Sequence, residues 1–268
     1  TPQILRVANA LIQKNRQRIE KELIPMLPDG VPVVCHLAED STKEAEWMVK
    51  NIETLHQMGV AYNEMTVMYR AHYVTRTIEE VLLRSKIPYT IYSGVQFFGR
   101  MEIKDALCYL RIIVYKDDLS FRRIANVPKR NLGVRRMKFL EEYTEQHGGT
   151  LYDALVKNLE HEIFRGTKAR EFVTLIEKYA TSYAERTISE VLTSILHESG
   201  YEKLLRTEGA QDRLDNLAEL KQAVFSFETS AGEETDLEAY LKSVAILSNM
   251  DIADSHDRVK LMTVHTAK

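Results

Sequence analysis

The stretch V-K-L-M-T-V-H-T-A-K, residues 259–268, decides how the rest of the chain is interpreted. Its first part is mostly β-branched or aliphatic, which is typical of a short strand buried on both faces. The strand leads directly into the polar side chains of Thr263, His265, Thr266 and Lys268, which can contact phosphate, sugar or base. Open α/β sheets bind their ligands at the carboxyl ends of their strands, so this end is a candidate binding site. Because the sequence stops here without a cap or turn, we expect a piece of a longer protein.

The N-terminal part of the chain alternates between helical and strand patterns. Residues 4–15 carry apolar side chains at helical spacing and predict a helix with one wide buried face. Ser41 and Thr77 each precede a glutamate at capping-box spacing, which predicts two further helices. Strand, helix, strand, helix, strand is the order expected of a parallel α/β sheet. The β-prone runs that predict the strands are residues 31–37, 66–69 and 89–92.

From residue 103 to residue 250 the pattern is helical throughout. Apolar side chains recur at helical spacing, as at Phe172 and Ile176, and mark helix faces that are buried in a core. Capping boxes that begin at Thr187 and Thr235 predict two of the helix starts. This part of the chain therefore predicts an all-α domain.

The return to a strand at the C-terminal end is explained by a helical domain inserted into an α/β domain. A lone strand after a helical tail would leave its backbone N–H and C=O groups unpaired. We therefore expect a mostly helical α/β fold, in which residues 1–100 and 252–268 form a partial parallel-sheet domain. Residues 101–251 are expected to form the large all-α inserted domain.

The composition is that of a globular protein of one or two domains. The chain has 268 residues, of which 44% are hydrophobic and 28% charged. Its net charge of −3 predicts no strong overall attraction to polyanions, so any nucleic-acid surface must be local. Cys35 and Cys108 are too few for a disulfide framework and lack zinc-site spacing, so we expect a reducing compartment and no metal site. No apolar run reaches membrane-spanning length, and we expect a cytoplasmic protein without membrane contact.

The strongest local charge asymmetry lies in residues 119–138, L-S-F-R-R-I-A-N-V-P-K-R-N-L-G-V-R-R-M-K. This run has no acidic residue, and its turn residues from Pro128 to Gly133 precede a helix that begins near Val134. Backbone N–H groups at a helix N-terminus suit a phosphate. Two interpretations stay open: a sequence-independent, salt-sensitive contact with a duplex, or a solvated basic helix face. The basic residues are Arg122, Arg123, Lys129, Arg130, Arg135, Arg136 and Lys138.

One stretch has the glycine spacing of a phosphate-binding loop but lacks the residues that would bind phosphate. G-V-Q-F-F-G-R, residues 94–100, has the glycine spacing of such a loop, but Arg100 and Met101 replace the Lys and Ser/Thr that serve phosphate and magnesium. Two polar strand ends remain as candidates: Arg-Ala-His at residues 70–72 and Thr-Val-His at residues 263–265. If the two strands are parallel neighbours, both ends emerge at one edge of the sheet, so we expect them to form one site.

Five stretches, in order along the chain, carry a resemblance to a known family. They are T-P-Q-I-L-R-V-A-N-A-L-I (1–12), V-M-Y-R-A-H-Y-V-T-R-T-I-E-E-V-L-L (67–83), I-P-Y-T-I-Y-S-G-V-Q-F-F-G-R-M-E-I-K-D-A-L-C-Y-L-R (87–111), N-V-P-K-R-N-L-G (126–133) and residues 259–268. Together they resemble the UvrD/PcrA/Rep-type superfamily 1 DNA helicases. The matches are similar to the second RecA-like motor domain, its helical insertion, the duplex-contacting element of that insertion, and motif V, which normally continues Gly-Leu-Glu.

The resemblance implies a DNA contact for each candidate residue. Single-strand contacts fall on Arg70, His72, Thr263 and His265. The family commonly has Asn where this chain has His72, so the chemistry of that contact differs here. The duplex element normally reads Gly-Ile-Gly, and here Asn131 replaces its first glycine; Asn tolerates a positive φ better than most residues. Duplex contacts fall on Lys129, Arg130, Asn131, Gly133, Arg135 and Arg136.

The resemblance also implies cofactors and partners. The parent protein would be an ATP-driven 3′-to-5′ DNA helicase that uses ATP and Mg2+. It would act on single strands and single/double-strand junctions, together with the remaining motor domain of the same chain. This sequence holds no Walker A lysine, no Walker B acid pair and neither of the family's γ-phosphate arginines. We therefore expect no catalytic residue, no bound cofactor and no ATP hydrolysis in this fragment alone.

The alternative is an independent, non-catalytic helical module that binds nucleic acid or an acidic protein through its basic face. The two hypotheses differ in the flanking sequence. A Gly-Lys-Ser/Thr loop upstream and Gly-Leu-Glu directly after residue 268 would indicate the helicase.

Overall fold

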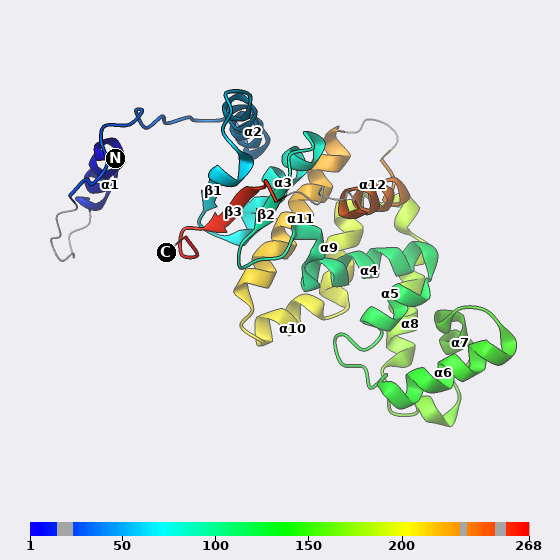
Figure 1. Cartoon of the computed structure of the whole chain (residues 1–268). Helices are drawn as coiled ribbons and strands as arrows, with labels where there is room; N and C mark the ends of the chain where they lie inside the picture. The colour runs from blue at the N-terminus through cyan, green and yellow to red at the C-terminus, as the bar shows by residue number, and fades with distance from the viewer. Residues whose placement is uncertain (15–23, 231–234, 250–255, 268) are drawn as a thin grey trace. The chain divides into compact units, whose positions relative to one another are not determined.

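The computed structural model describes residues 1–14, 24–230, 235–249 and 256–267 (Figure 1). The chain divides into two units, Thr1–Glu44 and Ala45–Lys268. The strands are β1 (Thr66–Tyr69), β2 (Tyr89–Ile91) and β3 (Val259–Thr263). The helices are α1 (Pro2–Ile12), α2 (Ser41–Gln57), α3 (Thr75–Arg84), α4 (Met101–Tyr115), α5 (Asp118–Ile124), α6 (Val134–His147), α7 (Leu151–Lys157), α8 (Ala169–Ala180), α9 (Ile188–Glu198), α10 (Tyr201–Thr207), α11 (Gln211–Ser230) and α12 (Leu237–Asn249).

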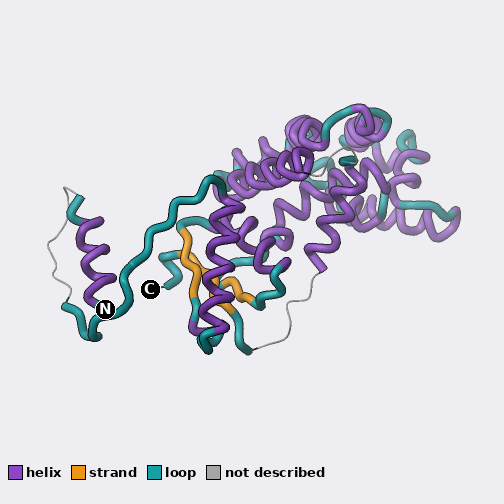
Figure 2. The backbone as a smooth tube through the Cα atoms, turned by 90° about the horizontal axis from the view of Figure 1, so that it is seen from above, coloured by secondary structure: helices purple, strands orange, loops and turns teal. Residues whose placement is uncertain are grey.

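The last strand of the chain is the central strand of the sheet. The strand order is β1-β3-β2, and both pairings are parallel. The strands lie side by side in Figure 2, where they are drawn in orange. The register pairs Tyr69 with Thr263 and Tyr89 with Val259. Val259 and Leu261 are fully buried. The predicted mostly helical α/β fold with a partial parallel sheet is confirmed, and so is the return of the chain to that sheet at residue 259.

Two hydrophobic cores lie within Ala45–Lys268. The sheet core contains Ala45, Val49 and Ile52 of α2, Ile78 and Leu82 of α3, and the inward side chains of the strands. The helical core is built around α4, which contacts α5, α8, α9, α11 and α12. From α4 it takes Ile103, Ala106, Leu110 and Ile112, all fully buried. Full burial of such an aliphatic side chain stabilises the fold by about 1.5–3 kcal/mol.

Two predictions for the N-terminal unit are wrong. Residues 2–12 form the predicted helix, α1, but it has no buried side chain, and Leu11 is 75% exposed. Residues 31–37 form no strand, and Val31 and Leu37 are 86% and 95% exposed. A strand needs a neighbour for its backbone N–H and C=O groups, and the sheet β1-β3-β2 pairs none of these residues. Regularly spaced apolar side chains indicate that a helix or strand has an apolar face, but they do not show which other residues cover that face.

The helix starts are capped partly as predicted. Thr187 and Glu190 form the expected capping box of α9. The capping boxes predicted at Ser41, Thr77 and Thr235 are wrong. The aspartate next to Ser41 and the aspartate next to Thr235 cap their helices instead, and the helix expected at Thr77 begins earlier. Asp40 accepts from Lys43 N at 2.8 Å, Asp236 accepts from Ala239 N at 2.6 Å, and α3 begins at Thr75. A carboxylate at N-cap satisfies the same free N–H groups as a hydroxyl.

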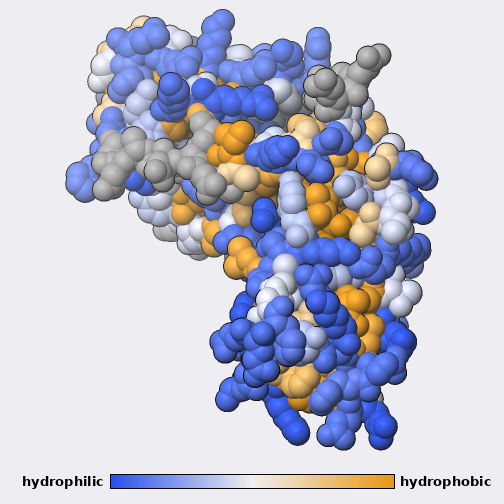
Figure 3. Space-filling view, turned by 90° about the vertical axis from the view of Figure 1, so that its right-hand side faces the viewer, coloured by the Kyte–Doolittle hydropathy of each residue, from blue (hydrophilic) through white to orange (hydrophobic). Residues whose placement is uncertain are grey.

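Figure 3 shows one face of the molecule, on which hydrophilic side chains, drawn in blue, surround smaller apolar patches. In the part of the chain that the structure describes, none of the helices combines the length and apolar character needed to cross a lipid bilayer.

Candidate functional site

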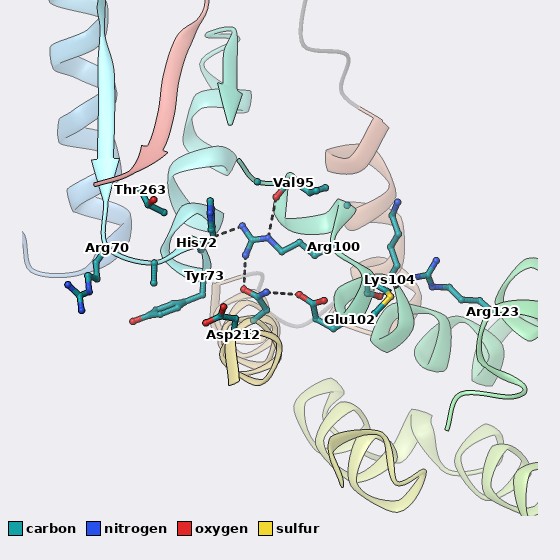
Figure 4. Close-up of a pocket in the computed structure, with 15 residues that line it drawn as sticks. Arg70, His72, Tyr73, Val95, Arg100, Glu102, Lys104, Arg123, Asp212 and Thr263 are labelled. Carbon is teal, nitrogen blue, oxygen red and sulfur yellow. Dashed lines mark hydrogen bonds between the residues drawn. The ribbon is translucent and has the colours of Figure 1, made fainter. Parts of the chain in front are cut away.

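A cleft lies at the carboxyl ends of β1 and β3. Its volume is about 680 Å3. It is lined by Arg70, which follows β1, and by Thr263, which ends β3 (Figure 4). Because β1 and β3 are parallel neighbours, the expected meeting of the two strand ends at one edge is confirmed. The other charged or aromatic lining residues are His72, Tyr73, Arg100, Glu102, Lys104, Arg123 and Asp212.

His72 begins a short 3-10 turn, His72–Val74, which follows β1 after Arg70 and Ala71. Its Nδ1 lies 3.3 Å from the hydroxyl of Tyr69, whose ring meets the imidazole edge-on. Burial, and secondly the positive charge of Arg100, lower the pKa of His72 below its ordinary value of 6.5, while Asp212 opposes this shift. The imidazole is therefore neutral at pH 7, and a neutral imidazole can stack on a base, donate one hydrogen bond and accept another.

Thr263 and His265 occupy different environments. Thr263 is only 8% exposed, and its hydroxyl accepts from Thr266 N at 3.2 Å in the turn that follows β3. Val264 N donates to Tyr69 O at 3.0 Å, which continues the pairing with β1 beyond the strand. His265 is exposed and does not line the cleft. Arg70 is also exposed and points away from Arg100 in Figure 4. The structure thus brings together Arg70, His72 and Thr263, with His265 outside.

Arg100 forms the floor of the cleft. It is 7% exposed and donates to His72 O at 3.0 Å, Thr75 Oγ1 at 2.8 Å and Asn216 Oδ1 at 2.7 Å. A buried guanidinium is stable only when such acceptors surround it. The sequence reasoning missed Arg100 as a site residue, because Asn216 lies 116 positions away and local spacing carries no sign of it.

Acidic groups moderate the positive charge of the cleft. Arg123 pairs with Asp105 at 2.6 Å, and Glu102 accepts from Asn216 at 2.5 Å. Asp212 lies on the α11 side, below Arg100 in Figure 4. The cleft therefore suits an extended ligand that has anionic and polar parts. Among the described residues, no group of three or more His, Cys, Asp or Glu side chains could hold a metal ion.

The basic run is divided by the fold. Arg130 is 6% exposed, and its guanidinium donates to Ile124 O at 2.9 Å, Val127 O at 3.1 Å and Tyr109 Oη at 2.8 Å. It also lies over the ring of Phe172, at 4.7 Å. A side chain with these partners is not available to a ligand. Arg130 therefore does not fit the duplex contact that the sequence predicted, and its position is structural.

The turn before α6 has the predicted conformation. Asn131 has a φ of 62°, in the left-handed region, and Gly133 is the N-cap of α6. Asn126 Oδ1 accepts from Arg130 N and Leu132 N at 2.9 and 3.0 Å, which holds the turn closed. A helix N-terminus leaves N–H groups without an intrahelical acceptor, and at α6 these groups follow a turn whose backbone is held by hydrogen bonds.

The remaining cations of the run have separate surroundings. Lys129 and Arg135 are exposed, whereas Arg136 is half-buried and donates to Ile163 O at 2.7 Å. Lys129 lines a groove of about 870 Å3 that also contains Lys168. The backbone N–H of Lys168 donates to Arg130 O at 3.0 Å. Sequence reasoning missed Lys168, because a loop far along the chain brings it beside the turn.

Comparison with known proteins covers the whole chain. The profile of the UvrD-like helicase C-terminal domain matches residues 1–268. The chain belongs to this family. It is 34% identical over 278 residues to DNA helicase II of Escherichia coli (strain K12). This match covers 100% of the chain and 39% of that protein. It is 33% identical over 277 residues to ATP-dependent DNA helicase PcrA of Staphylococcus epidermidis, covering 100% of the chain and 38% of that protein.

The relation confirms the resemblance found in the sequence. PcrA of Staphylococcus aureus (strain Mu50) is 32% identical over 277 residues, with the same 38% of that protein covered. This UvrD-like helicase domain therefore spans under two fifths of the length of these relatives. Its cleft and basic turn thus lie within a UvrD-like helicase C-terminal domain.

Proposed function

We propose that this UvrD-like domain belongs to an ATP-driven 3′-to-5′ DNA helicase. In that protein it would supply contacts to single-stranded DNA and a helical part that contacts the duplex at the junction. The observation that carries the proposal is the cleft at the carboxyl ends of β1 and β3, where Arg70, His72 and Thr263 meet. Parallel α/β sheets bind their ligands at this edge.

The proposed single-strand contacts follow from the chemistry of each side chain. Arg70 is exposed and can pair with a phosphate, since a guanidinium matches phosphate geometry. The neutral imidazole of His72 can stack on a base or donate to it. Thr263 and His265 offer a hydroxyl and a second imidazole at the end of β3. Contacts of this kind do not read base identity, as a translocating enzyme requires.

The proposed duplex contacts centre on the turn before α6. Two features support this proposal: the exposed side chains of Lys129 and Arg135, and the backbone N–H groups from Gly133 onward. A helix N-terminus attracts a phosphate through these groups and through the helix dipole. Asn131 and Arg136 shape the turn, with Arg136 donating to Asn131 Oδ1 at 3.2 Å. Arg130 is left out of the contact set because it is buried.

The proposed domain division is the one expected from the sequence. Residues 1–100 and 252–268 would form part of the second RecA-like motor domain, and residues 101–251 its helical insertion. The separation of the sheet core from the helical core supports this division. Residues 250–255, which contain one proposed boundary, lie outside the described residues.

ATP and Mg2+ would bind in the whole protein, outside this chain. The PcrA relatives carry ATP dependence in their names. Of this chain's own residues, the glycine-spaced loop at residues 94–100 lacks the Lys and Ser/Thr of a phosphate loop. Its Arg100 is already bonded to His72 O and Asn216. We therefore propose that the chain alone does not hydrolyse ATP and that it works with the remaining motor domain.

The test uses the full-length protein that carries this chain. ATP hydrolysis is measured with and without oligo(dT), and binding to oligo(dT) is measured for His72→Ala beside the native protein. Stimulation by oligo(dT) and at least fivefold weaker binding by His72→Ala are expected, since one stacked base contributes about 1–3 kcal/mol. A protein that binds DNA but does not hydrolyse ATP would instead be the non-catalytic interaction module.

A further inference from the structure

A buried arginine holds the turn that carries His72. Arg100 is the N-cap residue of α4 and is 7% exposed. Its Nη2 donates to His72 O at 3.0 Å (Figure 4) and also to Thr75 Oγ1 at 2.8 Å. Its Nε donates to Val95 O at 3.2 Å, in the neighbouring loop. Arg100 therefore fixes the backbone of the His72 turn against the loop beside it.

The same guanidinium is anchored on the opposite side by α11. Its Nη1 donates to Asn216 Oδ1 at 2.7 Å, and Asn216 Nδ2 donates to Glu102 Oε1 at 2.5 Å. Asn216 and Glu102 are 8% and 4% exposed. A guanidinium presents its donors in a rigid planar fork, whereas a lysine ammonium is a single point donor. Lysine at this position would keep the charge and lose the simultaneous hold on His72 and Asn216.

Gly94 leaves the space that the imidazole occupies. A Cβ at residue 94 would lie 2.8 Å from Cε1 and 3.0 Å from Nδ1 of His72, and 2.8 Å from Cγ2 of Ile91. These distances are shorter than van der Waals contact. Ile91 is held in β2, whereas the His72 ring ends in the cleft. A side chain at residue 94 would therefore displace the imidazole.

We propose that Arg100 and Gly94 are positioning residues that orient His72 toward single-stranded DNA. The inference rests on the proposed single-strand contact of His72 and extends it to residues that need not touch DNA. Arg100 acts through the backbone of the turn, and Gly94 acts by leaving room for the ring. Each should therefore affect DNA binding only while His72 is present.

The experiment is a double-mutant cycle in the full-length protein. Binding to fluorescein-labelled oligo(dT) is measured for Arg100→Lys, Gly94→Ala and His72→Ala, and for each positioning variant combined with His72→Ala. Arg111→Lys is the matched control, because Arg111 lies on the same helix, pairs with Asp117 at 3.5 Å and does not line the cleft. Thermal unfolding of every variant shows whether the fold is kept.

Arg100→Lys and Gly94→Ala should each weaken binding about fivefold to tenfold, and less than about twofold in the His72→Ala background, because contacting residues couple. Equal losses in both backgrounds would overturn the inference. If the Arg100→Lys protein unfolds, the binding of Gly94→Ala with and without His72→Ala tests the inference, since Gly94→Ala removes no hydrogen bond. If His72→Ala weakens binding while both positioning variants bind normally, only this inference fails. If His72→Ala has no effect, the proposed His72 contact fails and this inference falls with it.

Discussion

Exposure distinguishes two arginines at each candidate surface. Arg100 and Arg130 are buried and surrounded by carbonyl oxygens, whereas Arg70 and Arg135 are exposed. A guanidinium is weakly hydrated and offers five donors, so several carbonyl groups can replace its water. The buried arginines hold turns in shape, and the exposed ones beside them remain available to phosphate. Each candidate surface thus pairs a structural arginine with one that can contact a ligand.

Arg130→Ala should destabilise the protein strongly. The substitution removes the hydrogen bonds that the guanidinium donates to Ile124 O, Val127 O and Tyr109 Oη, together with its contact with the ring of Phe172. Since hydrogen bonds from a charged group contribute about 1.5–3 kcal/mol and a buried side chain is truncated, we expect a loss of about 3 kcal/mol in the free energy of unfolding. Urea unfolding measures this change.

Arg135→Ala is the matched control for that measurement. Arg135 is exposed in the first turn of α6, so its removal should change the free energy of unfolding by less than about 0.5 kcal/mol. Equal losses for the two variants would contradict the structural role of Arg130.

Among the elements, the turn before α6 combines a backbone held by hydrogen bonds with exposed positive charges. Asn126 closes the turn through two backbone N–H groups, and Asn131 takes the left-handed conformation that reverses the chain. Gly133 then starts α6, and Arg135 lies on its exposed side. A rigid turn presents its N–H groups without a further loss of entropy, which favours binding of a phosphate.

The double variant Lys129→Ala with Arg135→Ala should weaken binding of a single/double-strand junction by the full-length protein. Each lost phosphate contact lowers the slope of log K against log salt by about 0.9, so the slope should fall by about 2. Fluorescence anisotropy with a labelled junction from low to moderate salt measures it. Binding to oligo(dT) should be retained, because neither residue lines the cleft.

Lys138→Ala is the control for the junction measurement. Lys138 is 73% exposed on the same helix and lies 3.7 Å from Glu142. Its removal should leave the salt slope nearly unchanged. An equal decrease for Lys138→Ala would mean that the whole basic face, and not the turn, attracts the duplex.

Local patterns predicted these elements well where the sequence itself contains the cause. The β-prone run at residue 259, the helix at Val134 and the positive φ of Asn131 all follow from neighbouring residues. The burial of Arg130 depends on Tyr109, 21 positions away, and Arg100 depends on Asn216, 116 positions away. Contacts at these separations leave no periodic trace in the sequence, so the sequence predicts a duplex contact for Arg130 and gives no sign of its burial. In residues 31–37, apolar side chains predicted a strand for which the described sheet provides no pairing.

In the molecule as a whole, β3 comes after the long helical segment and pairs with two strands, β1 and β2, that come before it. It pairs with β1 on one side and β2 on the other, and these two strands do not pair with each other. The helical part is tied back to the sheet side by Arg76 of α3, which meets Glu219 of α11 at 2.6 Å. The cleft edge therefore depends on β3, because Thr263 ends that strand opposite Tyr69, the residue before Arg70.

Leu261→Ala tests this dependence. Leu261 is fully buried at the centre of β3, and its truncation leaves a cavity in the sheet core. A leucine-to-alanine change of this kind costs about 2–5 kcal/mol in the free energy of unfolding, measured by urea denaturation. Val264→Ala, at a residue that is 59% exposed, should cost less than about 0.5 kcal/mol. Because β3 bridges β1 and β2 in the described sheet, Leu261→Ala should also weaken oligo(dT) binding by the full-length protein at temperatures where the fold persists. Normal binding together with lost stability would mean that β1 holds Arg70 and His72 in place without β3.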